Sequence, residues 1–435
     1  MELAGQKVAV LGAGRSGRAA AQLALRLGGG VAVYDAAGPE VFAEMPEGVE
    51  TFPGAGAADG RRCEADLVVV SPGIEPGGEF ARAFAERAGE FIGETEFAAR
   101  HYEGRIVAVT GTNGKTTTTE LVQRTLAAGG MTCEACGNYG RPLGDVVLDE
   151  SPPAAVALEV SSFQLETIRR FRPEVAVWMN FSADHMDRYA SVDEYRRAKL
   201  RIFENQTADD AAVVRLGEPV GELRARTVTF SASEEGGDYS LAGTVIRFEG
   251  RPVLDLAETR LRGVHNAENV MAALAAGRAL AVPFGAAVRA LDGYAPPVHR
   301  CELVGILDGI EYINDSKATN LHALESALLS QERPTVLIAG GKAKGLDYRP
   351  ILPVLRRKAR AAILIGEIRF ELAGVFSEAV PSRVAESLEE AVRLARAEAG
   401  PGATVLFSPG TSSFDMFAGY EARGEAFREA VHAMT

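Results

Sequence analysis

Short apolar runs that end in a glycine-rich turn recur along this chain. They have the sequences KVAVLGAG at residues 7–14, IVAVTGTNG at 106–114 and TVLIAGG at 335–341. Each run is typical of a buried strand, and stretches with helical periodicity follow. Strands that alternate with helices predict parallel sheets, with ligands gathered at the carboxyl ends of the strands. We therefore expect an α/β protein.

The length of the chain predicts more than one domain. With 435 residues it is too long for a single hydrophobic core. We expect a Rossmann-like N-terminal domain over residues 1–95, a central domain like those of P-loop ATPases over 96–296, and a Rossmann-like C-terminal domain over 297–435. The second boundary falls in YAPPVHR, which has two prolines and no periodicity. Inside the central domain, YSLAGTVIRFEGRPVLDL alternates with turns and predicts a small antiparallel insert.

Composition argues against several kinds of partner. The formal net charge of −13 disfavours nucleic acid, because a duplex demands a basic face. No apolar run reaches the roughly 20 residues that a membrane helix needs, and the N-terminus lacks the order of a signal peptide. We expect a cytoplasmic monomer with no nucleic-acid or membrane partner. Cys133 and Cys136 form CEAC, but a single pair cannot close a zinc site.

Lysine is rare in this chain, and its positions are informative. Of 46 basic residues only seven are lysine. A chain that uses arginine wherever a positive charge suffices is expected to keep lysine where an ε-amine is needed. Four of the seven lie in the motifs described below. The seven are Lys7, Lys115, Lys199, Lys317, Lys342, Lys344 and Lys358.

The stretch IVAVTGTNGKTTTTELV at 106–122 indicates a phosphate-binding loop. Its glycines fall between a predicted strand and a predicted helix, where free N–H groups and the helix dipole favour phosphate. Lys115 is placed to reach the β- and γ-phosphates of a nucleotide, and Thr116 to offer a hydroxyl to Mg²⁺. The usual loop has four residues between its first Gly and the Gly-Lys pair, whereas GTNGKT has two. We interpret the stretch as an ATP site.

The motif GAGRSG near the N-terminus supports two interpretations. Gly12, Gly14 and Gly17 fit the dinucleotide fingerprint, and Asp35 ends the next strand, where a ribose-binding acid belongs. Read alone, this pattern predicts an NAD-dependent dehydrogenase. Any nucleotide diphosphate can lie on such a turn, however, and the chain shows no obvious hydride-transfer site. We therefore favour a second nucleotide other than NAD.

Other polar residues follow predicted strands. Glu159 lies near the end of a buried strand beside the one that feeds the phosphate loop. In phosphoryl-transfer enzymes this is where a second acid meets Mg²⁺. A buried carboxylate without a cation would be costly, which favours a functional role. The other candidates at strand ends are Asp184, His185, Asp187, Asp315, Lys317, Thr319 and Lys344.

Taken together, the motifs resemble those of the Mur ligases over all three predicted domains. In chain order they are GTNGKTT, GNYG, LEVSSFQLE, DHMDRY, YRRAKLRIF, HNAEN, PVHR, NDSKATN and SPGTSSFDMF. The unusual spacing of the phosphate loop is the family's own. The resemblance implies an ATP-dependent amide ligase of peptidoglycan precursor synthesis. In that reaction the γ-phosphoryl group passes to the carboxylate of UDP-N-acetylmuramoyl-L-alanine, and the amine of D-glutamate then displaces phosphate from the acyl phosphate.

The resemblance also implies roles for individual residues. The ATP contacts would be Gly111, Thr112, Asn113, Gly114, Lys115, Thr116, Thr117, Asn269, Arg300 and Asp315. The UDP group would be held by Arg15, Ser16, Asp35 and Gly73, and the muramoyl-alanine arm by Asn138 and His185. The D-glutamate pocket would consist of Lys317, Thr319, Lys344, Ser413, Phe414 and Tyr420. The catalytic residues would be Lys115, Glu159, His185, Lys199, Lys317 and Lys344.

Two Mg²⁺ ions are implied, one held by Thr116 and Glu159 and the other by His185 and Lys199. Lys199 lies in EYRRAKLRIF among arginines, so a plain ion-pair role would have been filled by arginine. The resemblance implies a lysine that reacts with CO₂ to form a carbamate, whose oxygens suit a hard cation.

Two alternatives stay open at this point. One is another ATP-dependent ligase of the superfamily that adds a different amino acid or uses a folate. The other is a dehydrogenase or a non-catalytic nucleotide sensor.

Overall fold

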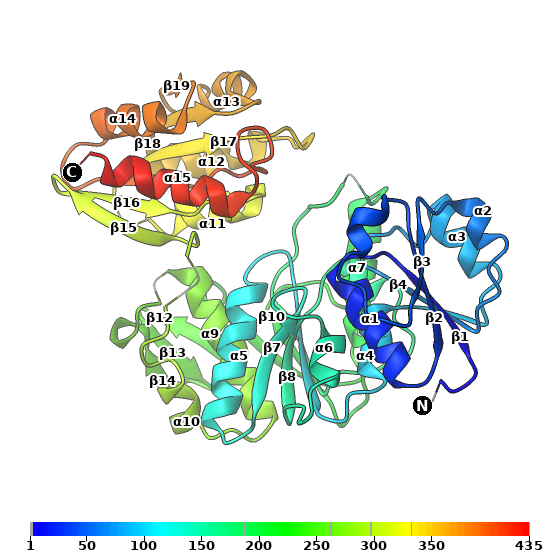
Figure 1. Ribbon diagram of the computed structural model, residues 1–435. Helices are drawn as coiled ribbons and strands as arrows, with labels where there is room; N and C mark the ends of the chain where they lie inside the picture. Colours follow the sequence, from blue (N-terminus) through cyan, green and yellow to red (C-terminus); the bar gives the residue numbers. More distant parts are fainter. Residues whose placement is uncertain (1–2, 187, 262, 296–297, 332, 435) are drawn as a thin grey trace. The chain divides into compact units, whose positions relative to one another are not determined.

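The computed structural model describes residues 3–186, 188–261, 263–295, 298–331 and 333–434. Within these ranges the chain forms three sheets with helices packed against them (Figure 1), which confirms the predicted α/β class. The chain divides into two compact units, Met1–Ala257 with Glu268–Asp292 and Glu258–Ala267 with Gly293–Thr435. The first two sheets lie in the first unit and the third sheet in the second. The domain boundary after residue 95 stays a prediction, and the one at 296–297 lies outside the described residues.

The N-terminal sheet is parallel and has the strand order β3-β2-β1-β4-β5. Its strands are β1 (Lys7–Leu11), β2 (Gly30–Asp35), β3 (Glu50–Pro53), β4 (Leu67–Val70) and β5 (Glu90–Gly93), and its helices are α1 (Arg15–Arg26), α2 (Ala57–Gly60), α3 (Glu79–Ala85) and α4 (Glu94–Ala99). Every residue of β4, LVVV, is buried because helices cover both faces of such a sheet. The strand order reverses between β1 and β4, and a ligand is expected beside that point.

The central sheet has the order β14-β13-β12-β11-β10-β9-β6-β8-β7. Its strands are β6 (Arg105–Thr110), β7 (Cys133–Gly137), β8 (Ala155–Glu159), β9 (Val175–Trp178), β10 (Ala211–Arg215), β11 (Arg226–Ser231), β12 (Tyr239–Ala242), β13 (Val245–Phe248) and β14 (Arg251–Asp255). Its helices are α5 (Lys115–Ala128), α6 (Leu143–Val147), α7 (Ser162–Leu165), α8 (Val192–Leu200), α9 (Val264–Ala279) and α10 (Phe284–Arg289). The predicted antiparallel insert is confirmed as β12–β14, and it extends this sheet instead of standing apart.

The third sheet has the order β15-β16-β20-β17-β18-β19, with β15 antiparallel to β16 and the other pairs parallel. Its strands are β15 (Glu302–Leu307), β16 (Ile310–Asn314), β17 (Thr335–Gly340), β18 (Ala359–Ile365), β19 (Ser382–Val384) and β20 (Thr404–Phe407). Its helices are α11 (Leu321–Leu329), α12 (Leu352–Lys358), α13 (Arg369–Phe376), α14 (Leu388–Ala399) and α15 (Tyr420–His432). Helices α11 and α14 are capped by Asn320 and Ser387, and each side chain accepts one free N–H group of the first turn.

The N-terminal and central sheets share one hydrophobic core. Buried side chains from β1, from α6 and from β9, among them Val10, Leu143 and Trp178, belong to one contiguous cluster. Helices α1 and α6 approach closely at Gly144, where an added Cβ would lie 3.3 Å from the Cβ of Ala19. The small residues therefore allow the two helices to bury the surface between these sheets.

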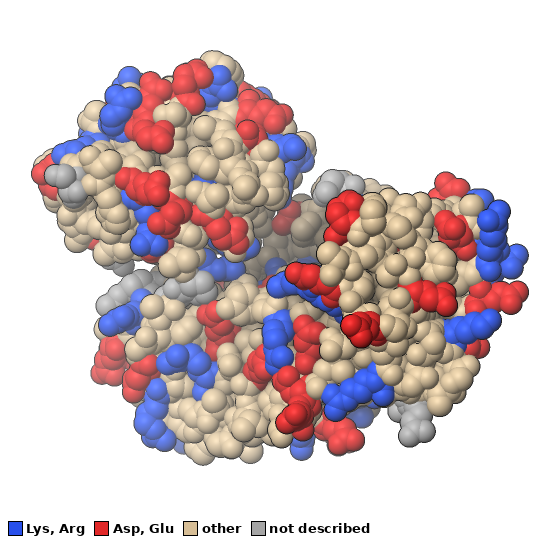
Figure 2. All heavy atoms as spheres, in the orientation of Figure 1, with Lys and Arg blue, Asp and Glu red and all other residues tan. Residues whose placement is uncertain are grey.

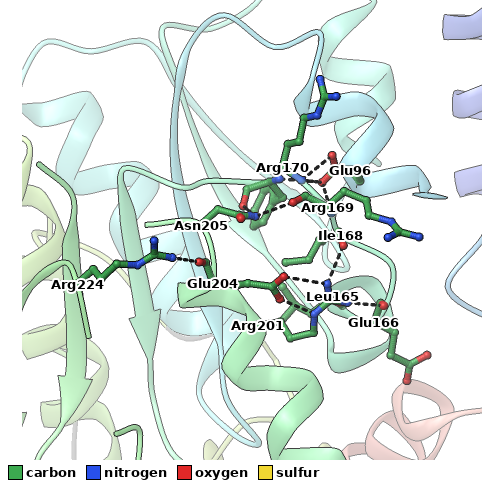
Figure 3. A network of polar contacts seen from close by, with 11 residues as sticks. Glu96, Leu165, Glu166, Ile168, Arg169, Arg170, Arg201, Glu204, Asn205 and Arg224 are labelled. Atoms are coloured by element: carbon green, nitrogen blue, oxygen red, sulfur yellow. Dashed lines mark hydrogen bonds and ion pairs between the residues drawn. The ribbon is translucent and has the colours of Figure 1, made fainter. Parts of the chain in front are cut away.

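A fully buried carboxylate, that of Glu96 in the first turn of α4, ties this helix to the segment before β9 (Figure 3). It accepts the backbone N–H groups of Arg169, Arg170 and Phe171 at 2.8–3.0 Å. It also accepts the Nε–H of Arg100 at 2.7 Å. Because charge-assisted bonds to a buried carboxylate are strong, this one side chain fixes the segment that leads into β9.

Charged side chains of both signs are interspersed on the face of the molecule drawn in Figure 2. Among the described residues no helix is long and apolar enough to cross a membrane.

We predict that Glu96→Gln loosens this segment, because an amide cannot accept all four N–H groups and leaves buried donors unpaired. The expected loss is about 2–4 kcal/mol of local stability, which would speed amide hydrogen exchange at 169–171 by tenfold or more. Glu90→Gln is the matched control, since Glu90 pairs with the same Arg100 but its side chain is 36% exposed. Equal exchange rates in the two variants would contradict the prediction.

Candidate active site

The loop between β6 and α5 has the backbone of a phosphate-binding loop. Gly111 and Gly114 have φ of 151° and 83°, a region that favours glycine. An added Cβ would lie 2.8 Å from the Cβ of Met179 at the first position and 2.5 Å from Oδ1 of Asn269 at the second. The loop is held by Asn180, whose carbonyl and side-chain oxygens accept the N–H groups at positions 112 and 113, both at 2.9 Å. The loop thus presents the N-terminus of α5 in a fixed conformation.

Glu159 lies at the carboxyl end of β8 and is buried. Its carboxylate accepts the hydroxyl of Thr116 at 2.8 Å and the side-chain amide of Asn138 at 2.7 Å. The structure therefore brings together three of the predicted site residues, one of which, Thr116, is the second residue of α5. A hydroxyl and a carboxylate are ligands that Mg²⁺ prefers. Among the described residues, no group of three or more His, Cys, Asp or Glu side chains is placed to hold a metal ion.

Lys199 on α8 is buried, with 2% of its surface exposed. Its Nζ donates to the carbonyl of Gly111 at 3.0 Å and lies 4.9 Å from the centre of the Tyr195 ring. Lys115 donates to the same carbonyl at 3.0 Å and to that of Thr112 at 2.9 Å. Burial and the neighbouring charge of Lys115 hold the pKa of Lys199 well below its ordinary value. Because two positive charges at one carbonyl would repel each other, this arrangement favours a neutral Lys199.

His185 lies in the turn after β9 and has a positive φ of 57°. Its ring meets those of Phe163 and Tyr195 edge to face, with centres 5.0 and 5.8 Å apart. Its backbone N–H donates to the carboxylate of Asp184, which is buried. Asp187, the third candidate of this turn, lies outside the described residues.

The predicted UDP residues follow β1, β2 and β4 of the N-terminal sheet. Arg15 and Ser16 begin α1, which follows β1, and Gly73 lies in the turn after β4. These residues therefore lie on the two sides of the point between β1 and β4 where the strand order reverses. The carboxylate of Asp35 accepts the backbone N–H groups of Ala13 and Ala37 at 2.7 and 2.9 Å. In this structure Asp35 therefore stabilises the glycine-rich turn after β1 through its bond to Ala13.

In the second unit, Asp315 follows β16. Its carboxylate accepts the Ser408 hydroxyl at 2.9 Å and the N–H of Cys301 at 3.2 Å. Burial raises the pKa of Asp315 to about 7. Arg300, the residue before Cys301 in the chain, is close enough for its charge to oppose that rise.

Two lysines of the second unit contact other predicted residues. The Nζ of Lys317 lies 3.6 Å from the centre of the Tyr420 ring, a cation–π contact. The Nζ of Lys344 donates to the carbonyl of Thr319 at 3.0 Å. The residues Ser413 and Phe414 follow β20, where Ser413 is buried and Phe414 is 67% exposed. The predicted pocket residues thus lie at the carboxyl ends of the parallel strands β16, β17 and β20.

Comparison with known proteins identifies the family. A model of the Mur ligase middle domain matches residues 109–277, and one of the Mur ligase glutamate ligase domain matches residues 299–410. A UDP-N-acetylmuramoylalanine--D-glutamate ligase from Geotalea uraniireducens is 41% identical over all of this chain and 99% of its own length. One of the same name from Chlorobium phaeobacteroides is 40% identical over 99% of this chain and 98% of its own.

The chain belongs to the Mur ligase family.

Solved Mur ligases have the same fold. The UDP-N-acetylmuramate-alanine ligase of Thermotoga maritima superposes with a TM-score of 0.60 at 20% identity, covering 99% of this chain and 100% of its own. The MurF ligase of the same organism, solved with ADP, superposes with a TM-score of 0.61 at 16% identity, covering 100% of this chain and 97% of its own. Matches at such low identity establish the fold alone.

Sequence reasoning missed some residues that shape the site of this Mur ligase. Asn180 holds the phosphate loop. The sequence signal that could have revealed it is its position as a polar residue just after a buried strand. Arg423 is buried and donates to the hydroxyl and carbonyl of Ser316 and to the carbonyl of Thr411. It joins the turns after β16 and β20, yet nothing in the local pattern around it indicated this role.

We predict that Gly114→Ala in this Mur ligase raises the Kd for ATP tenfold or more, because the methyl group collides with Asn269. Gly130→Ala is the matched control, since Gly130 has a similar φ of 91° but open space around its added Cβ. Both variants carry the backbone strain of about 1 kcal/mol, so calorimetric titration with ATP separates the collision from the strain. Equal Kd values in the two variants would refute the collision.

Proposed function

We propose that this chain is a UDP-N-acetylmuramoylalanine--D-glutamate ligase. It would use ATP to join the carboxylate of UDP-N-acetylmuramoyl-L-alanine to the amine of D-glutamate in peptidoglycan precursor synthesis. The observation that carries the proposal is the contact of Thr116 with Glu159 beside the phosphate loop, in a chain about 40% identical to full-length relatives of that name. We place the enzyme in the cytoplasm as a monomer.

The chemistry matches the charges of the site. A carboxylate oxygen of the muramoyl substrate attacks the γ-phosphorus, ADP leaves, and an acyl phosphate forms. The D-glutamate amine, having lost a proton, then attacks the acyl carbon, and phosphate leaves. Because the first step joins two anions, positioning and charge neutralisation supply most of the catalysis. Lys115 would turn from its loop carbonyls to the phosphates.

Thr116 and Glu159 would hold one Mg²⁺, and His185 and Lys199 a second. Bound there, the ions would neutralise phosphate charge during transfer. The adenosine end of ATP would be bound by Asn269, Arg300 and Asp315. Asn138 would direct its amide to the muramoyl-alanine arm.

Lys199 would act as a carbamate. Its amine is buried, shares the Gly111 carbonyl with Lys115, and lies on the helix that follows the His185 turn. The neutral amine attacks CO₂, forms an N–C bond and releases one proton. The product is an anion that pairs with Lys115 and offers oxygen to Mg²⁺.

We predict that Lys199→Arg retains less than about 1% of activity although it keeps the charge, because a guanidinium forms no carbamate. Lys199→Ala should regain part of its activity when formate or acetate is added, since either can occupy the place of the carbamate oxygens. Lys7→Arg, at an exposed lysine at the start of β1, is the control and should be unaffected. Full activity in Lys199→Arg would rule out the carbamate.

We predict that Lys344→Ala raises the KM for D-glutamate tenfold or more and the KM for ATP less than threefold. The side-chain carboxylate of D-glutamate needs a cation, and Lys344 lies against Thr319 in the proposed pocket. Lys342→Ala removes an equal charge from the same loop and should change neither constant. A change confined to the KM for ATP would show that the pocket is misassigned.

Phosphate release tests the function itself. The purified protein is given ATP, a panel of UDP-muramoyl acceptors and a panel of amino acids. Release that requires both UDP-N-acetylmuramoyl-L-alanine and D-glutamate is the expected result, and release with another amino acid alone would overturn the proposal.

A further inference from the structure

Arg188 connects separate parts of the first unit through one guanidinium group. It donates to the carbonyls of Pro72 at 3.1 Å and Ile74 at 3.4 Å. It also donates to the carboxylate of Glu166 at 2.7 Å, and it lies 4.2 Å from the centre of the Phe163 ring. The two carbonyls precede it by 116 and 114 residues in the chain, so the contact is created by the fold.

The parts that Arg188 joins carry residues of the proposed site. The turn after β4 contains Gly73, proposed for the UDP group. The helix α7 starts at Ser162, three residues after Glu159. The backbone N–H of Arg188 donates to the carbonyl of His185 at 3.0 Å. One residue therefore lies between the proposed UDP turn and the proposed metal residues.

The chemistry of these contacts requires arginine. The side chains of Arg188 and Glu166 are 13% and 18% exposed, so the pair is largely removed from water. Tyr189, the next residue, donates its hydroxyl to the same carboxylate at 2.5 Å. A guanidinium is planar and has several donors in fixed directions, so it can bond two carbonyls and a carboxylate while it stacks on a ring. A lysine ammonium cannot reproduce this set.

We propose that Arg188 is a positioning residue for the ligation. It holds the turn with Gly73 against the turn with His185, and so fixes the UDP end of the muramoyl substrate relative to the place where its carboxylate is phosphorylated. This inference rests on the proposed function. Among the described residues its side-chain contacts run to the turn after β4, to Phe163 of α7 and to Glu166 directly after that helix. Its loss is therefore expected to act on the UDP substrate more than on ATP.

The test compares Arg188→Lys with Arg197→Lys, a matched change at an exposed arginine on the neighbouring helix α8. We expect Arg188→Lys to raise the KM for UDP-N-acetylmuramoyl-L-alanine tenfold or more, and the KM for ATP and D-glutamate less than threefold. Tyr189→Phe should shift the same constant two- to threefold, because it removes one support of Glu166. Arg197→Lys should behave as the wild type. Thermal unfolding of each variant shows whether it is folded.

Two outcomes would overturn the inference. One is an unchanged KM for the UDP substrate in Arg188→Lys, and the other is an equal rise in all three KM values together with a lowered Tm. Failure of the proposed function would be separate, because the wild type would then release no phosphate with these substrates. If the wild type is inactive, the Kd for UDP is measured instead by calorimetric titration. Equal Kd values for Arg188→Lys and the wild type would then overturn the positioning role.

Discussion

The pairing of β6 with β8 and β9 is the interaction on which the site depends. In a parallel sheet the carboxyl ends of neighbouring strands meet at one edge, and the register decides which residues lie side by side there. The observed register places Glu159 and Asn180 on either side of the loop that starts at Gly111. Each then bonds that loop or its helix, Asn180 through two oxygens and Glu159 through Thr116. A shift of one residue would turn Glu159 to the opposite face of the sheet.

The placement of lysine and arginine follows a physical division. Arginine stays protonated in proteins, so it suits contacts that must keep their charge. Arg188, Arg201 and Arg423 each donate to backbone carbonyls that join distant segments (Figure 3 shows Arg201). Lysine can lose its proton when buried, and Lys115 and Lys199 share one carbonyl at the phosphate loop. In these contacts arginine fixes the structure, and we propose that the two lysines at the phosphate loop are groups whose charge responds to a substrate.

Sequence patterns predicted those parts of the site that local structure determines. The loop at 111–117, Glu159 and the turn at Asp315 each follow an apolar strand, and parallel pairing brings such positions to one edge. Asp35 was correctly placed at the end of β2, but the pattern did not reveal that its carboxylate bonds two backbone N–H groups. The roles proposed for these residues in binding and catalysis stay predictions.

The parts that escaped prediction depend on contacts between distant segments. Arg188 and Arg423 are among 39 arginines (46 basic residues less seven lysines), and their partners lie about 116 and 107 residues away. No periodicity within a window of 18 residues can encode such pairs. The domain boundary after residue 95 stays a prediction, and the N-terminal and central sheets on its two sides share one core.

The single tryptophan of the chain has a consequence for spectroscopy. Trp178 is fully buried at the end of β9, pairs with the last residue of β6 and donates its indole N–H to the carboxylate of Glu218 at 3.0 Å. Indole emission depends on the polarity around the ring and on such a bond. The protein therefore contains one indole fluorophore, on the strand beside the one that leads into the phosphate loop. Its emission reports on the central sheet, and events that leave this sheet unchanged, including local unfolding in the second unit, do not alter the indole signal.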